Sequence, residues 1–525
     1  MKRIKYIALL TTALLVTFSS CMKDLDTVPL DDTEVTAAEI YEDPENYKKV
    51  LAKLYAGLAV SGQEGPEGMA DISGIDEGFG QYLRGMFHHQ ILSTDEMVIG
   101  WDDQTIKDFV YQNWGAGDVF ISAMYYRIFY QISLANEYIR ETSDSRLDDR
   151  NVDAALREEI QQYRAEARYL RAFSYWHALD IFGNVPFTTD EDPIGAFLPE
   201  QISRTALFEY LETELQEIAP MMAEPKANDY GRVDKAAAWM LLAKLYMNAE
   251  VYIGQPRYSD ALTYINQILN SGYSLENEYQ HLFMADNYLA EDEIIMRVPY
   301  DGIETQTYGG TTFLIKAAIG GDMSTSDMGV DDGWGGLRTT PQFVDLFEED
   351  DPRALFFTEG QTKEITSLSD FQNGYAVQKF TNMRRDGTPG SNLEFPDTDF
   401  PLFRLADVYL MYAEAVLRGG GGDENTAVEY VNLLRERAWG DDSGNISANE
   451  LTLDFILDER GRELYWEGHR RTDLIRFGKF AGDTYLWSWK GESRDGLPTD
   501  VRYNLFPIPD ADITANPNLV QNPGY

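Results

Sequence analysis

The part of the chain that most resembles a catalytic site is residues 456–480, ILDERGRELYWEGHRRTDLIRFGKF. It places Glu459, Glu463, Glu467 and His469 among five arginines. Two carboxylates four residues apart share a helical face, but the Glu-Gly-His order lacks the i, i+4 pair of a helical zinc site. Because arginines bind carboxylates through paired hydrogen bonds, we predict a structural salt-bridge network here and not a catalytic site.

The other features that could support catalysis are weak. His88 and His89 are adjacent, so on regular structure their side chains point apart and do not readily share a metal. The sequence contains no GxSxG nucleophile turn and no HExxH zinc motif, and the loop at 308–312 lacks the lysine of a phosphate-binding loop. Among 88 acidic residues no pair stands out as a glycosidase pair. The sequence therefore predicts that the protein is not an enzyme.

Three aromatic residues stand in loops where they could bind a ligand. Trp101 lies in ILSTDEMVIGWDDQTIKD (91–108), a stretch with five acidic residues. Tyr308 opens the Gly-rich loop YGGTT, and Trp334 lies in GWGG. A large ring in a polar loop either packs into the core or is covered by a ligand, such as the C–H face of a sugar. The residues alone leave both interpretations open.

The elements that must position these loops are mainly helices. Apolar residues recur at helical spacing through the first half of the chain, and short polar turns join the segments. The expected helices begin after Pro44 and at Asp118, and continue over 152–182, 203–222, 234–252 and 258–269. Small residues at close-contact positions, such as Ala236, Ala237 and Ala243, suggest tetratricopeptide-like hairpins.

The pattern changes near residue 277. From there to about residue 400, short extended runs and Gly-rich loops predict loop with minor strand. Helices are expected again over 401–417, 425–437 and 451–468. We predict a mainly α fold, with a tetratricopeptide-like helical-hairpin scaffold and a large, irregular, loop-rich insertion. The expected divisions are a signal peptide (1–20), an N-terminal helical region (21–275) and a C-terminal region with the insertion and closing helices (276–525).

The charge of the chain excludes several classes of partner. Lys and Arg number 44 and Asp and Glu number 88, so the formal net charge is 44 − 88 = −44. Such a surface repels nucleic acid and anionic lipid, whereas a neutral ligand, such as most sugars, meets no repulsion. Aromatic residues make up 13% of the chain, which leaves rings for a binding surface.

The first twenty residues have the features of an export signal. Three basic residues precede an apolar run (7–18) that is too short to span a bilayer. Cys21 is the only cysteine in the sequence and therefore has no partner for an internal disulfide. It directly follows two serines. This arrangement resembles the lipobox of a bacterial lipoprotein. We expect cleavage before Cys21 and lipidation of its thiol, with no other segment that spans a membrane.

Five long blocks resemble the RagB/SusD family, in the expected order along the whole chain. They are EARYLRAFSYWHALDIFGNVPF (166–187), GRVDKAAAWMLLAKLYMNAEVY (231–252), FPDTDFPLFRLADVYLMYAEAV (395–416), ERGRELYWEGHRRTDLIRFGKF (459–480) and LFPIPDADITANPNLVQNPGY (505–525). The resemblance implies a surface-exposed lipoprotein of the outer membrane with a SusD-like helical scaffold. It also implies that the protein binds a glycan without cleaving it and forms a lid on a SusC-like TonB-dependent transporter.

Within the family, the chain looks most like the starch-binding members, which implies a neutral α-glucan as ligand. FMADN (283–287), YDGIETQTYGGTTFL (300–314) and YLWSWKG (485–491) carry this likeness. Those members hold the sugar with an arc of aromatic rings and several polar side chains. Transferred position by position, the likeness assigns glycan binding to Trp101, Tyr308, Trp334, Arg84, Gln104 and Asp76.

Two positions depart from this pattern. Ile99 stands where the starch-binding members have another tryptophan, and Gln104 replaces a contact asparagine. Losing one ring costs about 1 kcal/mol or more of binding, so a related glycan such as a fructan is an alternative ligand. Some RagB-like proteins deliver oligopeptides, which makes peptide uptake a second alternative. A lid with no ligand of its own is a third.

Calcium is the one cofactor that the resemblance suggests. The segment MADNYLAEDE supplies oxygen donors of the kind that calcium prefers, namely Asp286, Asn287, Glu291 and Asp292. Such clusters also arise by chance in a chain this acidic. No other cofactor is expected.

Overall fold

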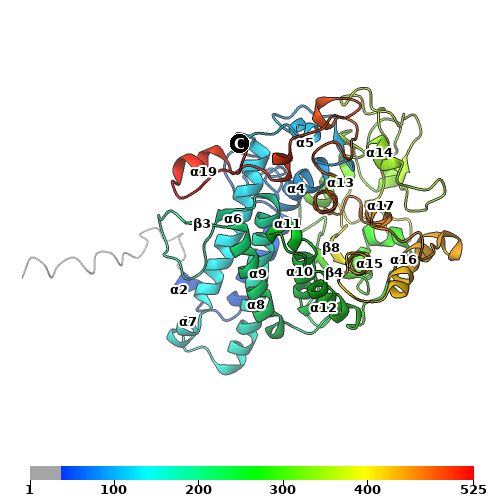
Figure 1. The fold of residues 1–525 in the computed structure, drawn as a ribbon. Helices are drawn as coiled ribbons and strands as arrows, with labels where there is room; N and C mark the ends of the chain where they lie inside the picture. The colour runs from blue at the N-terminus through cyan, green and yellow to red at the C-terminus, as the bar shows by residue number, and fades with distance from the viewer. Residues whose placement is uncertain (1–36) are drawn as a thin grey trace, which may run out of the picture. The chain divides into compact units, whose positions relative to one another are not determined.

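Helices dominate the structure, a computed structural model that describes residues 37–525 (Figure 1). Cys21 and the expected signal peptide lie outside the described residues. Residues 50–525 form one compact unit, and residues 37–49 belong to a separate N-terminal unit. Among the described residues, no helix has the length and apolar character needed to cross a membrane.

The α-helices of the first half are α2 (Ala37–Ile40), α3 (Asn46–Ala59), α4 (Tyr82–Phe87), α5 (Lys107–Tyr111), α6 (Val119–Glu141), α7 (Asp144–Asp149), α8 (Ala154–Ile181), α9 (Arg204–Ile218), α10 (Lys235–Met247), α11 (Ala249–Ile253) and α12 (Tyr258–Leu269). The α-helices that follow are α13 (Gly310–Lys316), α14 (Pro341–Val344), α15 (Leu405–Leu417), α16 (Glu424–Trp439), α17 (Leu453–Leu464), α18 (Arg470–Arg476) and α19 (Asp510–Ala515). The longest α-helix of the first half is α8, which packs against α6 and α9.

Aspartates cap the N-termini of α6, α8 and α10. The Asp118 carboxylate accepts hydrogen bonds of 2.8 and 3.0 Å from two backbone N–H groups of the first turn of α6. Asp153 and Asp234 cap α8 and α10 in the same way. These N–H groups have no partner inside the helix, so the carboxylate supplies the missing acceptor. The predicted N-cap at Asp118 is confirmed.

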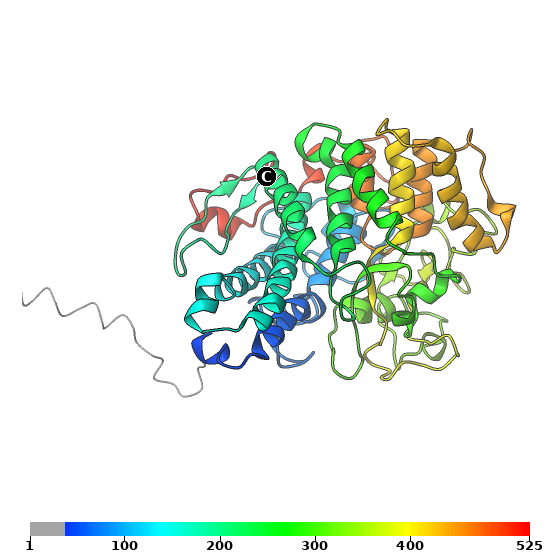
Figure 2. The same cartoon turned by 90° about the horizontal axis from the view of Figure 1, so that it is seen from below.

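The long helices pack as neighbouring pairs (Figure 2). Helix α8 packs between α6 and α9, α10 packs on α12, and α15 packs on both α12 and α16. Their facing sides are buried, with α10 buried at nearly every position. The predicted mainly α scaffold of helical hairpins is confirmed. The division of the chain at residue 275 stays a prediction.

The strands are short and pair in twos, always antiparallel. They are β1 (Val98–Ile99) with β5 (Leu337–Arg338), β2 (Val185–Pro186) with β3 (Gln201–Ile202), β4 (Ile294–Val298) with β8 (Phe400–Arg404), and β6 (Phe356–Phe357) with β7 (Ala376–Val377). The segment 277–400 is otherwise mostly loop, as predicted.

Two predicted helix boundaries are wrong. The helix expected over 401–417 begins only at Leu405, because residues 400–404 form β8 against β4. Pro401 lacks the N–H that a helix uses, and both strands are buried at all five positions. The helix expected over 451–468 ends at Leu464, since Trp466 and Gly468 have φ of 61° and 83°.

The β1–β5 pair brings two distant loops together. Ile99 pairs with Leu337, and the Gly100 N–H donates a hydrogen bond of 2.9 Å to the Gly336 carbonyl. The loop after β1 therefore lies against the loop before β5. These loops carry Trp101 and Trp334.

Candidate functional site

Trp101, Trp334 and Tyr308 lie next to one another, and we call these three rings the aromatic row. The ring centroids of Trp101 and Trp334 are 6.3 Å apart, and those of Trp334 and Tyr308 are 6.1 Å apart. All three side chains are half-buried. The row thus joins the loop of Trp101 to two loops that lie about two hundred residues later in the sequence.

Backbone contacts hold Trp101 and Trp334 in place. The Trp101 indole N–H donates to the Trp334 carbonyl at 3.3 Å, and the Trp334 N–H donates to the Lys316 carbonyl at 2.7 Å. Gly336 lies against the Trp101 indole so closely that a Cβ atom there would overlap the ring. The fold therefore fixes both indoles without burying them completely.

The Tyr308 hydroxyl is held by two carboxylates. Glu67 and Glu394 lie 2.9 and 2.8 Å from the phenol oxygen. Burial and these two acids raise the pKa of Tyr308, so the phenol stays neutral and donates its proton. The Tyr308 ring also lies 5.4 Å from the buried ring of Phe395. Its position is thus fixed from the hydroxyl end and from one side.

Arg84 lies beneath the row, on α4. Its guanidinium carbon is 3.6 Å from the ring centroid of Phe79 and 4.4 Å from that of Phe313. Its Nη1 donates to the Tyr308 carbonyl at 3.2 Å. Burial lowers the pKa of Arg84 to about 10, although the carboxylates of Asp76, Asp103 and Glu77 oppose this shift. The guanidinium therefore stays charged at neutral pH.

The three other positions singled out from the sequence differ in exposure. Asp76 is exposed, and its Oδ1 accepts a hydrogen bond of 2.9 Å from the Phe79 N–H. Gln104 is exposed on the loop after Trp101, with φ of 40°. Ile99 is fully buried in β1 and presents no surface to a ligand. The roles of these residues in glycan binding stay predictions.

Four residues that the sequence did not single out as binding residues also contact the row or Arg84. They are Glu67, Glu394, Phe79 and Phe313. Glu67 is 241 residues from its partner Tyr308. Spacing along the chain carries no signal for such contacts.

The predicted salt-bridge network at 459–480 is confirmed. Glu459, Glu463 and Glu467 are all fully buried or nearly so and pair with Arg353, Arg404 and other cations. Burial alone would raise the pKa of Glu463, but its arginine partners lower it to about 2. A carboxylate fixed in this way is a structural anion and is not poised to exchange protons near neutral pH.

The adjacent histidines are also structural. His88 and His89 are buried, and burial lowers the pKa of both. His88 contacts the rings of Phe120 and Phe313, whereas His89 contacts the Phe506 ring. The two imidazoles therefore face different parts of the core.

Three of the four proposed calcium donors, Asp286, Asn287 and Asp292, are engaged in protein contacts. Asp286 accepts from the Arg385 N–H at 3.1 Å, Asp292 pairs with Lys226, and Asn287 bonds to the backbone of Asp399. No group of three or more His, Cys, Asp or Glu side chains within residues 37–525 is arranged to hold a metal. Calcium binding by this loop stays a prediction.

Taken chemically, the aromatic row offers flat apolar faces beside hydrogen-bonding groups. Ring faces stack on the C–H groups of sugars, while carboxylates, an amide and a guanidinium bond to hydroxyls. The row is therefore suited to binding a sugar.

Comparisons with known proteins identify a family and relatives of this chain. Residues 359–525 match the model of the SusD family. The chain is 35% identical to the starch-binding protein SusD of Bacteroides thetaiotaomicron, over 99% of both chains. It is 26% identical to SusD-like protein P2 of Formosa agariphila, over 77% of this chain and 81% of that one.

Solved structures share the fold. A SusD superfamily protein from Parabacteroides distasonis has a TM-score of 0.71 at 22% identity and covers 94% of this chain and 100% of its own. Surface glycan-binding protein A from Bacteroides thetaiotaomicron, in complex with laminarihexaose, has a TM-score of 0.68 at 22% identity. It covers 91% of this chain and 99% of its own.

Proposed function

This chain belongs to the SusD family, and on that premise we propose that it is a non-catalytic glycan-binding protein that captures starch-type α-glucan oligosaccharides. The binding surface is the aromatic row with Arg84, Asp76 and Gln104 around it. The relative that shares 35% identity over nearly the full chain is named a starch-binding protein, which supports α-glucan as the ligand.

The observation that carries the proposal is the geometry of the row. Three half-buried rings lie with neighbouring centroids 6.1 and 6.3 Å apart, and hydrogen bonds hold the Trp101 indole, the Tyr308 hydroxyl and the Trp334 backbone. Rings that are ordered before the ligand arrives lose little conformational freedom on binding. A curved, helical glucan could stack successive sugar units on such a row.

The same proposal gives the protein a place in uptake. Lipidation at Cys21 anchors it to the outer membrane, facing outward, and it delivers the oligosaccharide to a SusC-like TonB-dependent transporter. The short signal-like segment before Cys21 and the family of the chain support this arrangement.

Titration of the full-length chain in detergent tests the ligand. Cyclic and linear maltooligosaccharides and a fructan are compared by calorimetry, on wild type and on Trp101→Ala. We expect α-glucan binding that the variant weakens at least about fivefold, since one stacking ring contributes about 1 kcal/mol or more. Tyr288→Ala is the matched control, because Tyr288 is an exposed ring outside the row.

Each alternative predicts a different result. Fructan binding without α-glucan binding would mean that the missing ring at Ile99 redirects the site. Binding of oligopeptides alone, unaffected by Trp101→Ala, would favour peptide uptake. Release of reducing ends from glycan by the purified chain would contradict the non-catalytic assignment.

A further inference from the structure

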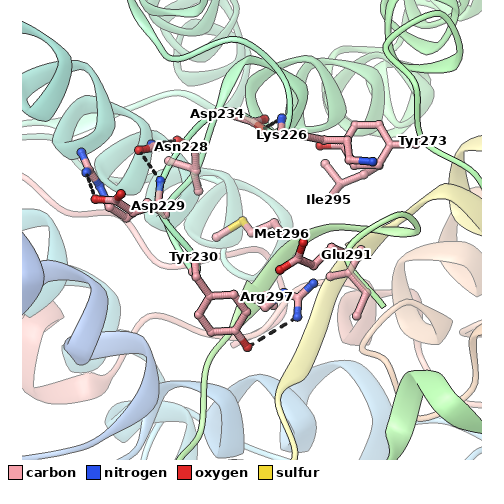
Figure 3. A pocket seen from close by; sticks show the side chains of 14 residues that line it. Lys226, Asn228, Asp229, Tyr230, Asp234, Tyr273, Glu291, Ile295, Met296 and Arg297 are labelled. Atoms are coloured by element: carbon pink, nitrogen blue, oxygen red, sulfur yellow. Dashed lines mark hydrogen bonds and ion pairs between the residues drawn. The ribbon is translucent and has the colours of Figure 1, made fainter. Parts of the chain in front are cut away.

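A cavity of about 160 Å³ lies apart from the aromatic row, between the loop that leads into α10 and strand β4 (Figure 3). Tyr273, just after α12, closes one side of it. A cavity of this size suits a single sugar residue and not a whole chain. No residue of the aromatic row lines it.

Tyr230 forms a fixed ring at the mouth of this cavity. Its side chain is 51% exposed, but its hydroxyl donates to the buried Asp399 carboxylate. Arg297 binds both partners, with Nη1 3.5 Å from the phenol oxygen and 3.3 Å from Asp399 Oδ2. Because the hydroxyl is satisfied inside the protein, the part of Tyr230 that faces solvent is its apolar ring. A sugar C–H face covers such a ring well.

Polar side chains line the wall of the cavity opposite Tyr230. Figure 3 shows Tyr273 across the cavity from Tyr230, with Glu291 between them on the β4 side. Glu291 is exposed, and its carboxylate makes no hydrogen bond to another residue in the described part of the chain. It is an acceptor available to a ligand hydroxyl. Asn228 also lines the wall, where its Nδ2 donates to the Val233 carbonyl at 2.7 Å and its Oδ1 accepts from the Asp229 N–H at 2.9 Å.

The cations of the wall are all paired within the protein. Lys226, Arg232 and Arg297 line it, and they pair with Asp292, Glu166 and Asp399 respectively. Within the described residues the wall therefore offers no unpaired cation to an anionic ligand. Glu291 is left as an acceptor for the hydroxyl groups of a ligand.

Hydrogen bonds connect the cavity to the loop that carries the row. Asp399, which holds Tyr230, accepts from the Tyr300 N–H at 2.9 Å. The Tyr300 hydroxyl accepts from Gln81 Nε2 at 3.2 Å, and Gln81 Oε1 accepts from the Gly310 N–H at 2.9 Å. The cavity and the row are thus parts of one rigid frame. A fixed separation allows one long glycan to bind both with added avidity.

We propose that this cavity is a second sugar-binding site, which takes one neutral pyranose residue. Tyr230 stacks on the sugar ring, and Glu291 accepts hydrogen bonds from its hydroxyls. The class of ligand rests on the function proposed for the aromatic row.

Hydrogen exchange of the full-length chain in detergent tests the two sites separately. Maltose, maltohexaose and laminarihexaose are the probes, and peptides covering 226–234 and 291–298 report on the cavity. Peptides covering 98–104 and 306–312 report on the row. We expect a probe to protect the cavity peptides in wild type and in Trp101→Ala. Tyr230→Ala should raise the sugar concentration for half-protection at least about fivefold, with Tyr288→Ala as the matched control.

Glu291→Ala is the second variant, since the side chain is exposed and its loss leaves the fold intact. It should also weaken protection of the cavity peptides and spare those of the row. Protection at the row with none at the cavity, for all three sugars, overturns the second site and leaves the proposed function standing. Equal protection in Tyr230→Ala, Glu291→Ala and wild type also overturns it. If no sugar protects the peptides of the cavity or those of the row, both the second site and the proposed function are contradicted.

Discussion

Gly336 supports the aromatic row because it has no side chain that would displace the Trp101 indole. Gly336 lies under the Trp101 indole with no room for a Cβ atom, whereas Gly115 has open space around it. The same substitution at these two positions therefore separates a local effect on the ring from the general effect of replacing glycine.

Gly336→Ala should push the indole out of the row and weaken oligosaccharide binding about tenfold. The β1–β5 pairing uses backbone groups and should survive. Calorimetry with maltohexaose gives the affinity, and circular dichroism checks the fold. Gly115→Ala should bind as wild type does. Wild-type affinity in Gly336→Ala would show that the indole position does not matter for binding.

Glu96 makes stability depend on pH. It is buried, and its Oε2 accepts from the Trp466 N–H at 3.0 Å. Burial raises its pKa from 4.5 to about 8, although Arg470 opposes the shift. Between pH 4.5 and about pH 8, the Glu96 carboxyl is protonated in the folded chain and ionised in the unfolded chain. Raising the pH through this range therefore destabilises the fold, and the full cost is present above about pH 8.

Glu96→Gln should remove this dependence, because an amide does not titrate. Urea unfolding at about pH 5 and about pH 9 measures it, as the free energy of unfolding of each protein. We expect wild type to lose on the order of a few kcal/mol more than the variant between these two values. Parallel losses in the two proteins would show that Glu96 does not carry the dependence.

At the scale of elements, one buried cation joins β8 to α17. Arg404 donates to Glu467 at 2.7 and 2.8 Å, to Glu463 at 2.6 Å and to Glu293 at 3.0 Å. Its side chain is 1% exposed and those of the three acids 0%. Strand β8, which takes the place of the start of the predicted helix, therefore also supplies one of the cations that pair with these three carboxylates.

Arg404→Met should destabilise the protein by roughly 3–5 kcal/mol, since it leaves buried carboxylates short of one cation. The matched change is Arg494→Met, which breaks an exposed pair with Asp495 and should alter stability little. Urea unfolding midpoints give both values. Equal midpoints for the two variants would contradict an essential role for Arg404.

The elements also show what a sequence can and cannot predict. Caps such as Asp118 and the periodic burial of α8 are local, and they were predictable to within a few residues. Strand β8 was not, because its partner β4 lies about a hundred residues earlier and no local pattern reveals the pairing. In the same way, resemblance pointed to Trp101 and Tyr308, but Glu394 meets Tyr308 only through the fold.

At the scale of the whole molecule, the net charge of −44 distinguishes the proposed ligand from a peptide. A neutral oligosaccharide gains nothing from the surface potential, so its affinity should be the same at low and high salt. A basic peptide would bind through that potential and weaken steeply as salt screens it. Titration of maltohexaose over a range of sodium chloride concentrations is the measurement. Strong salt dependence would contradict a neutral ligand.

The bonds that position the aromatic row end mostly on backbone atoms. Arg84 bonds to the carbonyl of residue 308, the N–H of residue 334 bonds to Lys316, and the N–H of Gly100 bonds to Gly336. Backbone groups are the same whichever side chain they carry. A point mutation that exchanges the ring at 308 or 334 thus leaves the loops on their path. Ligand preference can diverge between descendants of this protein, one substitution at a time, while the fold is inherited unchanged.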